Sequence, residues 1–410
     1  MKIAVIVSEF PKTSETFILH QITGLLDLGH DVQVFARSHP DEPTVHPDIV
    51  KYGIMERVHY PSVPAGRREK YLNACAWICR NINRDPVPII NSINLLKFGK
   101  RARSLELFYL ALPFYGYDFD IFHCHFGPNG AKLLPLKEIG FRGALVTSFH
   151  GYDVHSYTRV HGKEVYDGLF AAGDLFTCNT EYTKSQAAAL GCDEERIRIL
   201  PVGLDIAKYP FSARNYPEDG RIKILTVGRL VEKKGHEFML RALREVLRER
   251  DDVEYIIAGN GPLEEHLKGL VEAWELTDHV TFLTSVSDEE LLKLYRECHL
   301  FALTSVTAPN GDKEGQALVL QEAQATGMPV ISTFHNGIPE GVLHERSGFL
   351  VQEWDVGALR DTLLYLIGHP ERWADMGKAG REFVAQKYDI RKLNRDLVAI
   401  YATAIDGRKG

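Results

Sequence analysis

The sequence lacks a long hydrophobic run, which argues against a membrane-spanning helix. A helix needs about 18 or more apolar residues in succession to cross a bilayer, and no such stretch occurs in the 410 residues. The first apolar run, 1–7, is too short for a secretory signal, and the polar Ser8 and Glu9 follow it directly. We therefore expect a cytoplasmic protein.

The sequence also lacks paired cysteines and an excess of positive charge. Its six cysteines are scattered without C-x-x-C spacing, which in a chain of this size favours reduced thiols. The formal net charge is −7, so we expect no nucleic-acid partner. The length of 410 residues exceeds the roughly 250–300 at which a single core stops growing, so two domains are expected.

Short apolar runs alternate with helical patterns in both halves of the chain. The expected strands are 2–7, 31–36, 120–126, 144–153, 174–178 and 196–202 in the first half, and 222–227, 254–258, 280–283, 300–303 and 329–332 in the second. Helical segments fall between the second-half strands, near 235–249, 262–274, 287–297 and 315–326. This alternation predicts an α/β fold with two doubly wound, Rossmann-like domains. We place them at 1–202 and 203–386.

The segment 66–116 interrupts the alternation and is expected to form two or three helices. Between Arg67 and Arg103 it holds nine Lys or Arg residues against two acidic ones, interleaved with aromatic and aliphatic side chains. A basic helical insert with apolar residues predicts peripheral contact with anionic lipid at the inner face of the cell membrane. An ordinary solvated helix face is the alternative.

Two carboxylates organise the stretch 313–323. Glu314 and Gly315 precede a nearly all-apolar helical pattern that carries Glu322 eight positions after Glu314. In one helix the two carboxylates would lie about 12 Å apart and within roughly 80° of each other, so both could contact one elongated ligand. Because an apolar helix is normally buried, an ionised Glu322 needs a hydrogen-bond partner. Two glutamates on an ordinary helix are the alternative.

Two glycine-bearing loops follow the first two strands of the second half. Gly228, Arg229, Lys234 and Gly235 combine close backbone approach with cations, which suits a diphosphate. Gly259 and Gly261 begin a dinucleotide-like pattern, but Glu264 takes the place of the third glycine, so a close turn beside a nucleotide is the preferred interpretation.

Histidines and aspartates in the first half offer a further candidate site. His150, followed by Gly151 and Asp153, lies at the end of an expected strand, where it could contact a sugar hydroxyl. His123 and His125 could join His150 as zinc ligands, but no fourth ligand lies at a telling spacing, so no metal is expected. Asp118 and Asp120 are interpreted as turn residues.

Taken together, these motifs resemble the retaining glycosyltransferases of GT-B fold in glycosyltransferase family 4, and in particular the bacterial exopolysaccharide and colanic-acid branch. The motifs that carry the resemblance are 8–16, 120–125, 149–153, 228–235, 258–262, 314–322, 326–331 and 337–340. The resemblance implies two domains facing across a cleft, with a C-terminal helix at 387–410 crossing back to the first. It also implies transfer, with retention, of a sugar from a UDP- or GDP-sugar to a glycan or polyprenyl-linked acceptor, without metal or other cofactor.

The resemblance also implies roles for individual residues. Arg229 and Lys234 would bind the donor diphosphate and stabilise the leaving group. Glu322 would hold the ribose, while Glu314 and His150 would contact the donor sugar. The remaining implied contacts are the donor with Gly228, Gly259, Gly261, Gly315, Gln316, Ala317 and Leu318, the base with Val286, and the acceptor with Ser14, Glu15 and Asp153.

Three departures from the family pattern leave donor and acceptor open. Lys12, Thr13 and Ser14 stand where many members have two glycines, Gln316 and Ala317 replace an aromatic-glycine pair, and Thr284 replaces a common glycine. A non-catalytic nucleotide-sugar-binding protein is an alternative function. A nicotinamide-dependent oxidoreductase would need a complete glycine fingerprint and an acidic ribose ligand, and neither is found.

Overall fold

The computed structural model describes residues 1–12, 15–40 and 46–408. They form two compact units. The first comprises Met1–Cys178, Gln186–Leu200 and Asn394–Gly410, and the second comprises Asn179–Ser185 and Pro201–Leu393. Each unit has its own parallel sheet.

The first unit is built on a seven-stranded parallel sheet of order β3-β2-β1-β4-β5-β6-β7. The strands are β1 (Lys2–Glu9), β2 (Asp31–Ser38), β3 (Val58–His59), β4 (Ile121–His125), β5 (Ala144–Phe149), β6 (Leu175–Cys178) and β7 (Ile197–Ile199). Every residue of β4, β5 and β6 is buried, as in sheets covered on both faces. The helices between them include α1 (Thr16–Asp27), α7 (Gly127–Ile139), α8 (Ser156–His161), α9 (Asp167–Ala172) and α10 (Glu181–Ala189).

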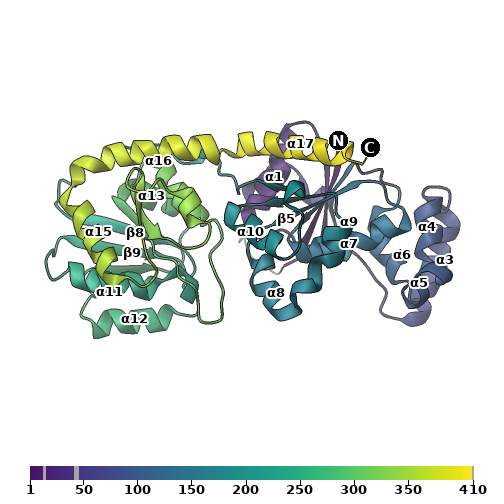
Figure 1. The fold of residues 1–410 in the computed structure, drawn as a ribbon, viewed down its shortest axis with the longest axis horizontal. Helices are drawn as coiled ribbons and strands as arrows, with labels where there is room; N and C mark the ends of the chain where they lie inside the picture. Colours follow the sequence, from purple (N-terminus) through teal and green to yellow (C-terminus); the bar gives the residue numbers. More distant parts are fainter. Residues whose placement is uncertain (13–14, 41–45, 409–410) are drawn as a thin grey trace. The chain divides into compact units, whose positions relative to one another are not determined.

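The insert forms more helices than its sequence predicts. Four α-helices occupy the described part of 66–116, where two or three were expected: α3 (Arg67–Asn81), α4 (Pro86–Ser92), α5 (Leu95–Arg103) and α6 (Glu106–Ala111). They gather beside α7 (Figure 1). Asn94 caps α5 by accepting from the main chain of Leu96 and Lys97, and Leu105, with φ 57°, separates α5 from α6. An apolar cluster of Trp77, Phe108 and Tyr115 joins the helices.

The second unit is built on a six-stranded parallel sheet of order β10-β9-β8-β11-β12-β13. Its strands are β8 (Ile222–Val227), β9 (Val253–Ala258), β10 (Val280–Leu283), β11 (Leu300–Leu303), β12 (Val330–Thr333) and β13 (Gly348–Val351). The helices include α11 (His236–Val246), α12 (Glu264–Ala273), α13 (Asp288–Glu297), α14 (Leu318–Ala325), α15 (Val356–Gly368) and α16 (Trp373–Lys387), and the chain then enters α17 (Ile390–Asp406). The predicted pair of doubly wound α/β domains is therefore confirmed.

The end of the chain belongs to the first unit. Residues from Asn394 onward, most of α17, group with the N-terminal sheet. Leu397, Tyr401 and Ala404 are buried at helical spacing, and the Tyr401 hydroxyl lies 2.8 Å from Nδ1 of His123 on β4. No helix in the parts of the chain that the structure describes is both long and apolar enough to cross a bilayer.

Candidate active site

The strand order of the second unit reverses between β8 and β11, which lie side by side at the centre of its sheet. Ligands of open α/β sheets bind outside the carboxyl ends of the strands at such a reversal. The loop after β8 carries Arg229 and Lys234, and the loop after β11 carries Glu314. The topology therefore brings the predicted diphosphate loop and one of the two predicted carboxylates to the same place.

Backbone contacts fasten these two loops to each other. The Thr304 hydroxyl donates to the Gly235 carbonyl at 2.8 Å, and the Val306 amide donates to the Lys233 carbonyl at 2.9 Å. A Cβ at Gly235, which has φ 66°, would lie 1.8 Å from the Thr304 carbonyl oxygen. Glycine is therefore required at 235 for the loops to meet.

Lys234 and Glu314 form an ion pair at this meeting point. Lys234 Nζ lies 2.5 Å from Glu314 Oε2, with side-chain exposures of only 12% and 14%. Burial raises the pKa of Glu314, but the ammonium groups of Lys234 and Lys233 outweigh it and lower that pKa to about 2. The carboxylate is therefore ionised at neutral pH.

Glu314 lies in a loop and not in the helix that carries Glu322. The helix α14 begins at Leu318, because Ala317 adopts the left-handed conformation with φ 58° and ψ 63°. The expected start of the helix at 315 is therefore wrong, and the 12 Å separation, which was calculated for one continuous helix, loses its basis. The stretch from Gln316 to Leu320 contains no glycine or asparagine, so it gave no signal for a left-handed residue at 317.

Glu322 has the hydrogen-bond partner that its buried position demands. The Tyr295 hydroxyl on α13 donates to Glu322 Oε2 at 2.7 Å. Burial raises the pKa of Glu322, and hydrogen bonds from Tyr295 and Tyr209 offset only part of this. Neither tyrosine was a predicted site residue, because Tyr295 lies 27 positions away and only the fold brings it to α14.

The glycines after β9 pack against the loop after β8. Cβ atoms at Gly259 and Gly261 would lie 2.1 Å from the Gly228 carbonyl oxygen and 2.5 Å from that of Leu230. The Leu230 amide also donates to the Asn260 carbonyl at 2.8 Å. A close turn is therefore present here, and it shapes the loop that carries Arg229.

Family models match almost the whole of this chain. The model described as Glycosyltransferase Family 4 matches residues 14–208, and that of Glycosyl transferases group 1 matches residues 210–383. A putative colanic acid biosynthesis glycosyltransferase of Escherichia coli is 33% identical over 98% of this chain and 99% of its own. This chain belongs to glycosyltransferase family 4.

Other comparisons agree with this assignment. An amylovoran biosynthesis glycosyltransferase of Erwinia amylovora is 33% identical over 89% of the chain and 90% of its own length. Among solved structures, an Anabaena protein crystallised with UDP and glucose has a TM-score of 0.71 at 17% identity, covering 97% of this chain and 98% of that one. Sucrose-phosphate synthase from Thermosynechococcus elongatus has a TM-score of 0.71 at 20% identity, covering 98% of both chains. The glycosyltransferase thus has the GT-B type of α/β fold.

In the first unit of the glycosyltransferase, His150 follows β5, which ends at Phe149 and not at 153 as expected. His150 Nε2 lies 3.2 Å from Nδ1 of His125, and the rings of Phe17 and Phe126 pack against His150 with centroids 4.9 Å and 4.7 Å away. Burial lowers the pKa of His150 to about 3, so it is neutral at physiological pH. Its contact with a donor sugar stays a prediction.

The predicted acceptor residues differ in their surroundings. Asp153 is buried and accepts from the amides of Gly127, His150 and Gly151, each at 3.0 Å. This carboxylate therefore shapes the turn after β5, and a role toward the acceptor stays a prediction. Glu15 forms an ion pair with Lys12 at 3.1 Å and precedes α1, while Ser14 lies outside the described residues.

Gln316 and Val286 are engaged within the second unit. The Gln316 side chain accepts from the Val202 amide at 2.7 Å and donates to the Val202 carbonyl at 2.8 Å. It is therefore held by the chain itself, and its predicted donor contact through the main chain is untested. Val286 is partly buried in the apolar cluster of this unit and precedes the capping residue Ser287 of α13.

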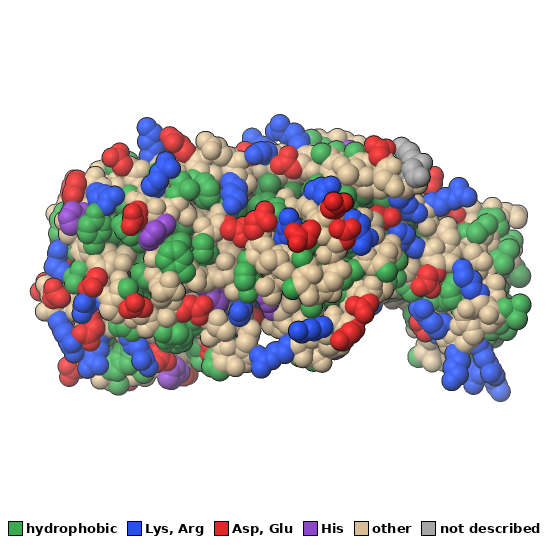
Figure 2. Space-filling view, in the orientation of Figure 1, with side chains coloured by type: hydrophobic (Ala, Val, Ile, Leu, Met, Phe, Trp, Pro, Cys, Tyr) green, Lys and Arg blue, Asp and Glu red, His purple; other side chains and the backbone are tan. Residues whose placement is uncertain are grey.

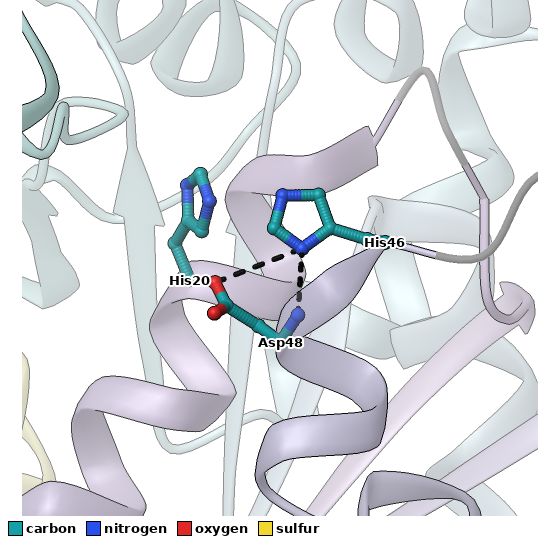
Figure 3. A group of neighbouring side chains, drawn as sticks. All are labelled: His20, His46 and Asp48. Carbon is teal, nitrogen blue, oxygen red and sulfur yellow. Dashed lines mark hydrogen bonds and ion pairs between the residues drawn. The ribbon is translucent and has the colours of Figure 1, made fainter. Parts of the chain in front are cut away.

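Two groups of histidines contain residue types that can bind a metal ion. His123 has both ring nitrogens occupied, by the Ser148 hydroxyl at 2.7 Å and the Tyr401 hydroxyl at 2.8 Å, which argues against the zinc set of His123, His125 and His150. Among the described residues, the ligand atoms of His20, His46 and Asp48 lie within 4.8 Å of one another (Figure 3). His46 Nδ1 accepts from the Asp48 amide at 3.2 Å, so capping of a short helix accounts for this pair.

Proposed function

We propose that this glycosyltransferase moves a sugar from a UDP- or GDP-sugar to a glycan or polyprenyl-linked acceptor in exopolysaccharide synthesis. The observation that carries the proposal is the Lys234 and Glu314 pair at the strand-order reversal of the second unit. Relatives named for colanic acid and amylovoran biosynthesis support the exopolysaccharide assignment.

The loop after β8 supplies the diphosphate site of the proposed enzyme. Arg229 is exposed, and its main-chain carbonyl accepts from Nε2 of the buried His236 at 3.1 Å. A guanidinium can bind phosphate oxygens in bidentate fashion, and Lys234 adds a point charge beside it. These two cations would stabilise the charge that develops on the leaving diphosphate.

The two carboxylates have separate tasks in this proposal. Glu322, steadied by Tyr295, would accept from the ribose hydroxyls. Glu314 would accept from hydroxyls of the donor sugar while Lys234 turns to the phosphate. A carboxylate accepts at both oxygens, so each suits a pair of hydroxyl donors.

Retention would follow from attack on the face that the diphosphate leaves. The acceptor hydroxyl forms a bond to the transferred carbon as the bond to the phosphate oxygen breaks, and its proton passes to the departing phosphate. No separate general base is then needed, because Arg229 and Lys234 hold the phosphate as it accepts the proton.

We also propose that the insert makes peripheral contact with a membrane. Leu72, Leu95 and Leu96 are 71%, 58% and 101% exposed, which is unusual for leucines. Lys97, Lys100 and Arg103 on α5 are also exposed, and Lys and Arg side chains gather on part of the insert (Figure 2). Exposed leucines beside basic residues fit an anionic bilayer surface, where apolar side chains insert and cations meet headgroups.

Release of UDP and GDP from a panel of nucleotide sugars, with and without a lipid-linked acceptor, tests the function. We expect one donor to be consumed only when acceptor is present. Lys234→Ala and Glu322→Ala should nearly abolish turnover while circular dichroism shows an intact fold. Binding without turnover on any acceptor would favour the non-catalytic nucleotide-sugar-binding alternative, and full activity in both variants would refute the site.

A further inference from the structure

A buried histidine holds the main chain of Glu314. The side chain of His335, after β12, is fully buried, and its Nε2 lies 3.0 Å from the Glu314 amide nitrogen. A main-chain amide can only donate, so Nε2 accepts and the ring proton resides on Nδ1. The structure thereby fixes the tautomer of this imidazole.

The other nitrogen of the same ring contacts a carboxylate. His335 Nδ1 donates to Glu353 Oε1 at 2.6 Å, and Glu353 Oε2 accepts from the Thr307 amide at 2.7 Å. Burial raises the pKa of Glu353, but hydrogen bonds from His335 and Thr307 outweigh it and keep that pKa below its ordinary value. The carboxylate therefore remains an acceptor for both groups at neutral pH.

These contacts fasten the loop after β11 at two points. Thr307 lies near its beginning and Glu314 near its end, and His335 with Glu353 connects them. The side-chain amide of Asn336 donates to the Glu314 carbonyl at 2.9 Å. Both the main-chain amide and the main-chain carbonyl of Glu314 are therefore hydrogen-bonded. The loop has no regular helix or strand between β11 and α14, so these side chains replace a regular hydrogen-bond ladder.

We propose that His335 and Glu353 are positioning residues that aim the Glu314 carboxylate at the donor sugar. The proposal rests on the proposed function for its last step, the contact between Glu314 and the sugar. A small displacement of a side chain that binds substrate can lower the reaction rate strongly, so such side chains are held in place by neighbouring groups. Arg229 and Glu322 lie on other segments, and Glu322 has its own partner in Tyr295. Loss of the His335 contact should therefore weaken recognition of the sugar and spare that of the nucleotide.

Three variants and one matched control test this. His335→Phe keeps a ring but removes the hydrogen bonds to Glu314, Glu353 and the Asn336 side chain. His335→Gln keeps an acceptor that reaches the Nε2 position, and Glu353→Gln weakens the link from Nδ1. His344→Phe is the control, because Nδ1 of His344 also holds a main-chain amide, that of Leu350, but makes no contact with Glu314. Thermal melts establish that each variant is folded, and His335→Gln and Glu353→Gln carry the test if His335→Phe is not.

The first measurement is amide hydrogen exchange of the peptide that contains 307–317, which needs no substrate. We expect exchange about fivefold to tenfold faster in His335→Phe than in the wild type or His344→Phe, with His335→Gln intermediate. Exchange equal to that of the control would overturn the positioning role at once.

The second measurement compares calorimetric affinities for UDP and GDP with those for UDP-glucose and GDP-mannose, together with KM and kcat. We expect His335→Phe to lower kcat/KM by roughly tenfold to a hundredfold, with unchanged affinity for the free nucleotide and partial rescue in His335→Gln. Equal weakening of nucleotide and nucleotide sugar would show a merely structural role. If the wild type binds neither nucleotide nor nucleotide sugar, the proposed function fails, and the exchange experiment still decides whether His335 holds the loop.

Discussion

At the scale of single residues, the charge of Glu314 should make the free energy of unfolding depend on pH. Its pKa lies at about 2 in the folded protein, against an ordinary value of 4.5. A carboxyl whose pKa is lowered by folding contributes stability that is full above the ordinary value and is lost as the pH falls through the folded value. The difference corresponds to about 3 kcal/mol, gained above pH 4.5 and lost progressively toward pH 2.

Urea unfolding of the wild type and Glu314→Gln between pH 6 and pH 3 measures this contribution. The free energy of unfolding of the wild type should fall more steeply over that range than that of the variant, because the amide cannot titrate. Parallel curves for the two proteins would show that Lys234 does not hold the pKa of Glu314 down.

A second residue-scale prediction concerns Ala317. A non-glycine residue at φ 58° carries about 1 kcal/mol of steric strain, which glycine would relieve at a smaller entropic cost. Ala317→Gly should therefore leave the free energy of unfolding unchanged or raise it by up to about 1 kcal/mol. In the helix α14, which follows Ala317, Ala323→Gly should lower the free energy of unfolding by about 1 kcal/mol or more, because Ala323 is helical and buried. Equal destabilisation by both, in thermal or urea unfolding, would contradict the left-handed assignment.

At the scale of elements, the strand runs of both sheets could be predicted because parallel strands covered on both faces are continuous apolar segments. The edge strands β3 and β13 could not. The first has only two residues, and the second, Gly348–Val351, begins with a glycine, which strands disfavour. The insert contained more helices than expected because Asn94 and the left-handed Leu105 divide it at points that hydrophobic periodicity does not mark.

The residues of the candidate site could likewise be predicted only in part from the sequence. Arg229, Lys234, Glu314 and Glu322 could be selected from their spacing after apolar runs. Their supports, Tyr295, His335 and Glu353, lie on other elements and are joined to them only by the fold. Residues that act through main-chain contacts leave no local signature, so the sequence placed Glu314 before the helix but did not reveal what holds its loop.

The insert gives an element-scale prediction about membranes. The double variant Leu95→Ser, Leu96→Ser should lose most co-sedimentation with vesicles rich in phosphatidylglycerol, and Lys97→Gln, Lys100→Gln should weaken binding by about 1 kcal/mol per charge removed. Exposed Val50 and Val63 lie outside the insert, so Val50→Ser, Val63→Ser is the matched control. Absence of binding by the wild type at low salt would return the insert to an ordinary solvated surface.

At the scale of the whole molecule, each unit supplies an α/β sheet with a strand-order reversal, and the ion pair of Lys234 and Glu314 lies at the reversal of the second. Most of α17 completes the first unit, where the Tyr401 hydroxyl contacts His123 on β4. Each unit is therefore assembled from separate stretches of the chain. The domain boundaries at 202 and 386 predicted from sequence remain predictions.

We expect turnover by this glycosyltransferase to be independent of divalent metal ions. Arg229 and Lys234 would neutralise the leaving diphosphate, a task that a divalent ion performs in other phosphate chemistry. Turnover should therefore be unchanged after exhaustive dialysis against EDTA, measured with the donor that the panel identifies, and added Mg²⁺ or Mn²⁺ should alter the rate by less than about twofold. Strict dependence on a divalent ion would contradict the cationic mechanism. His46→Ala and Asp48→Ala would then show whether the ion acts through the cluster in Figure 3, because loss of metal from that cluster should remove the dependence while Lys234 and Glu314 remain intact.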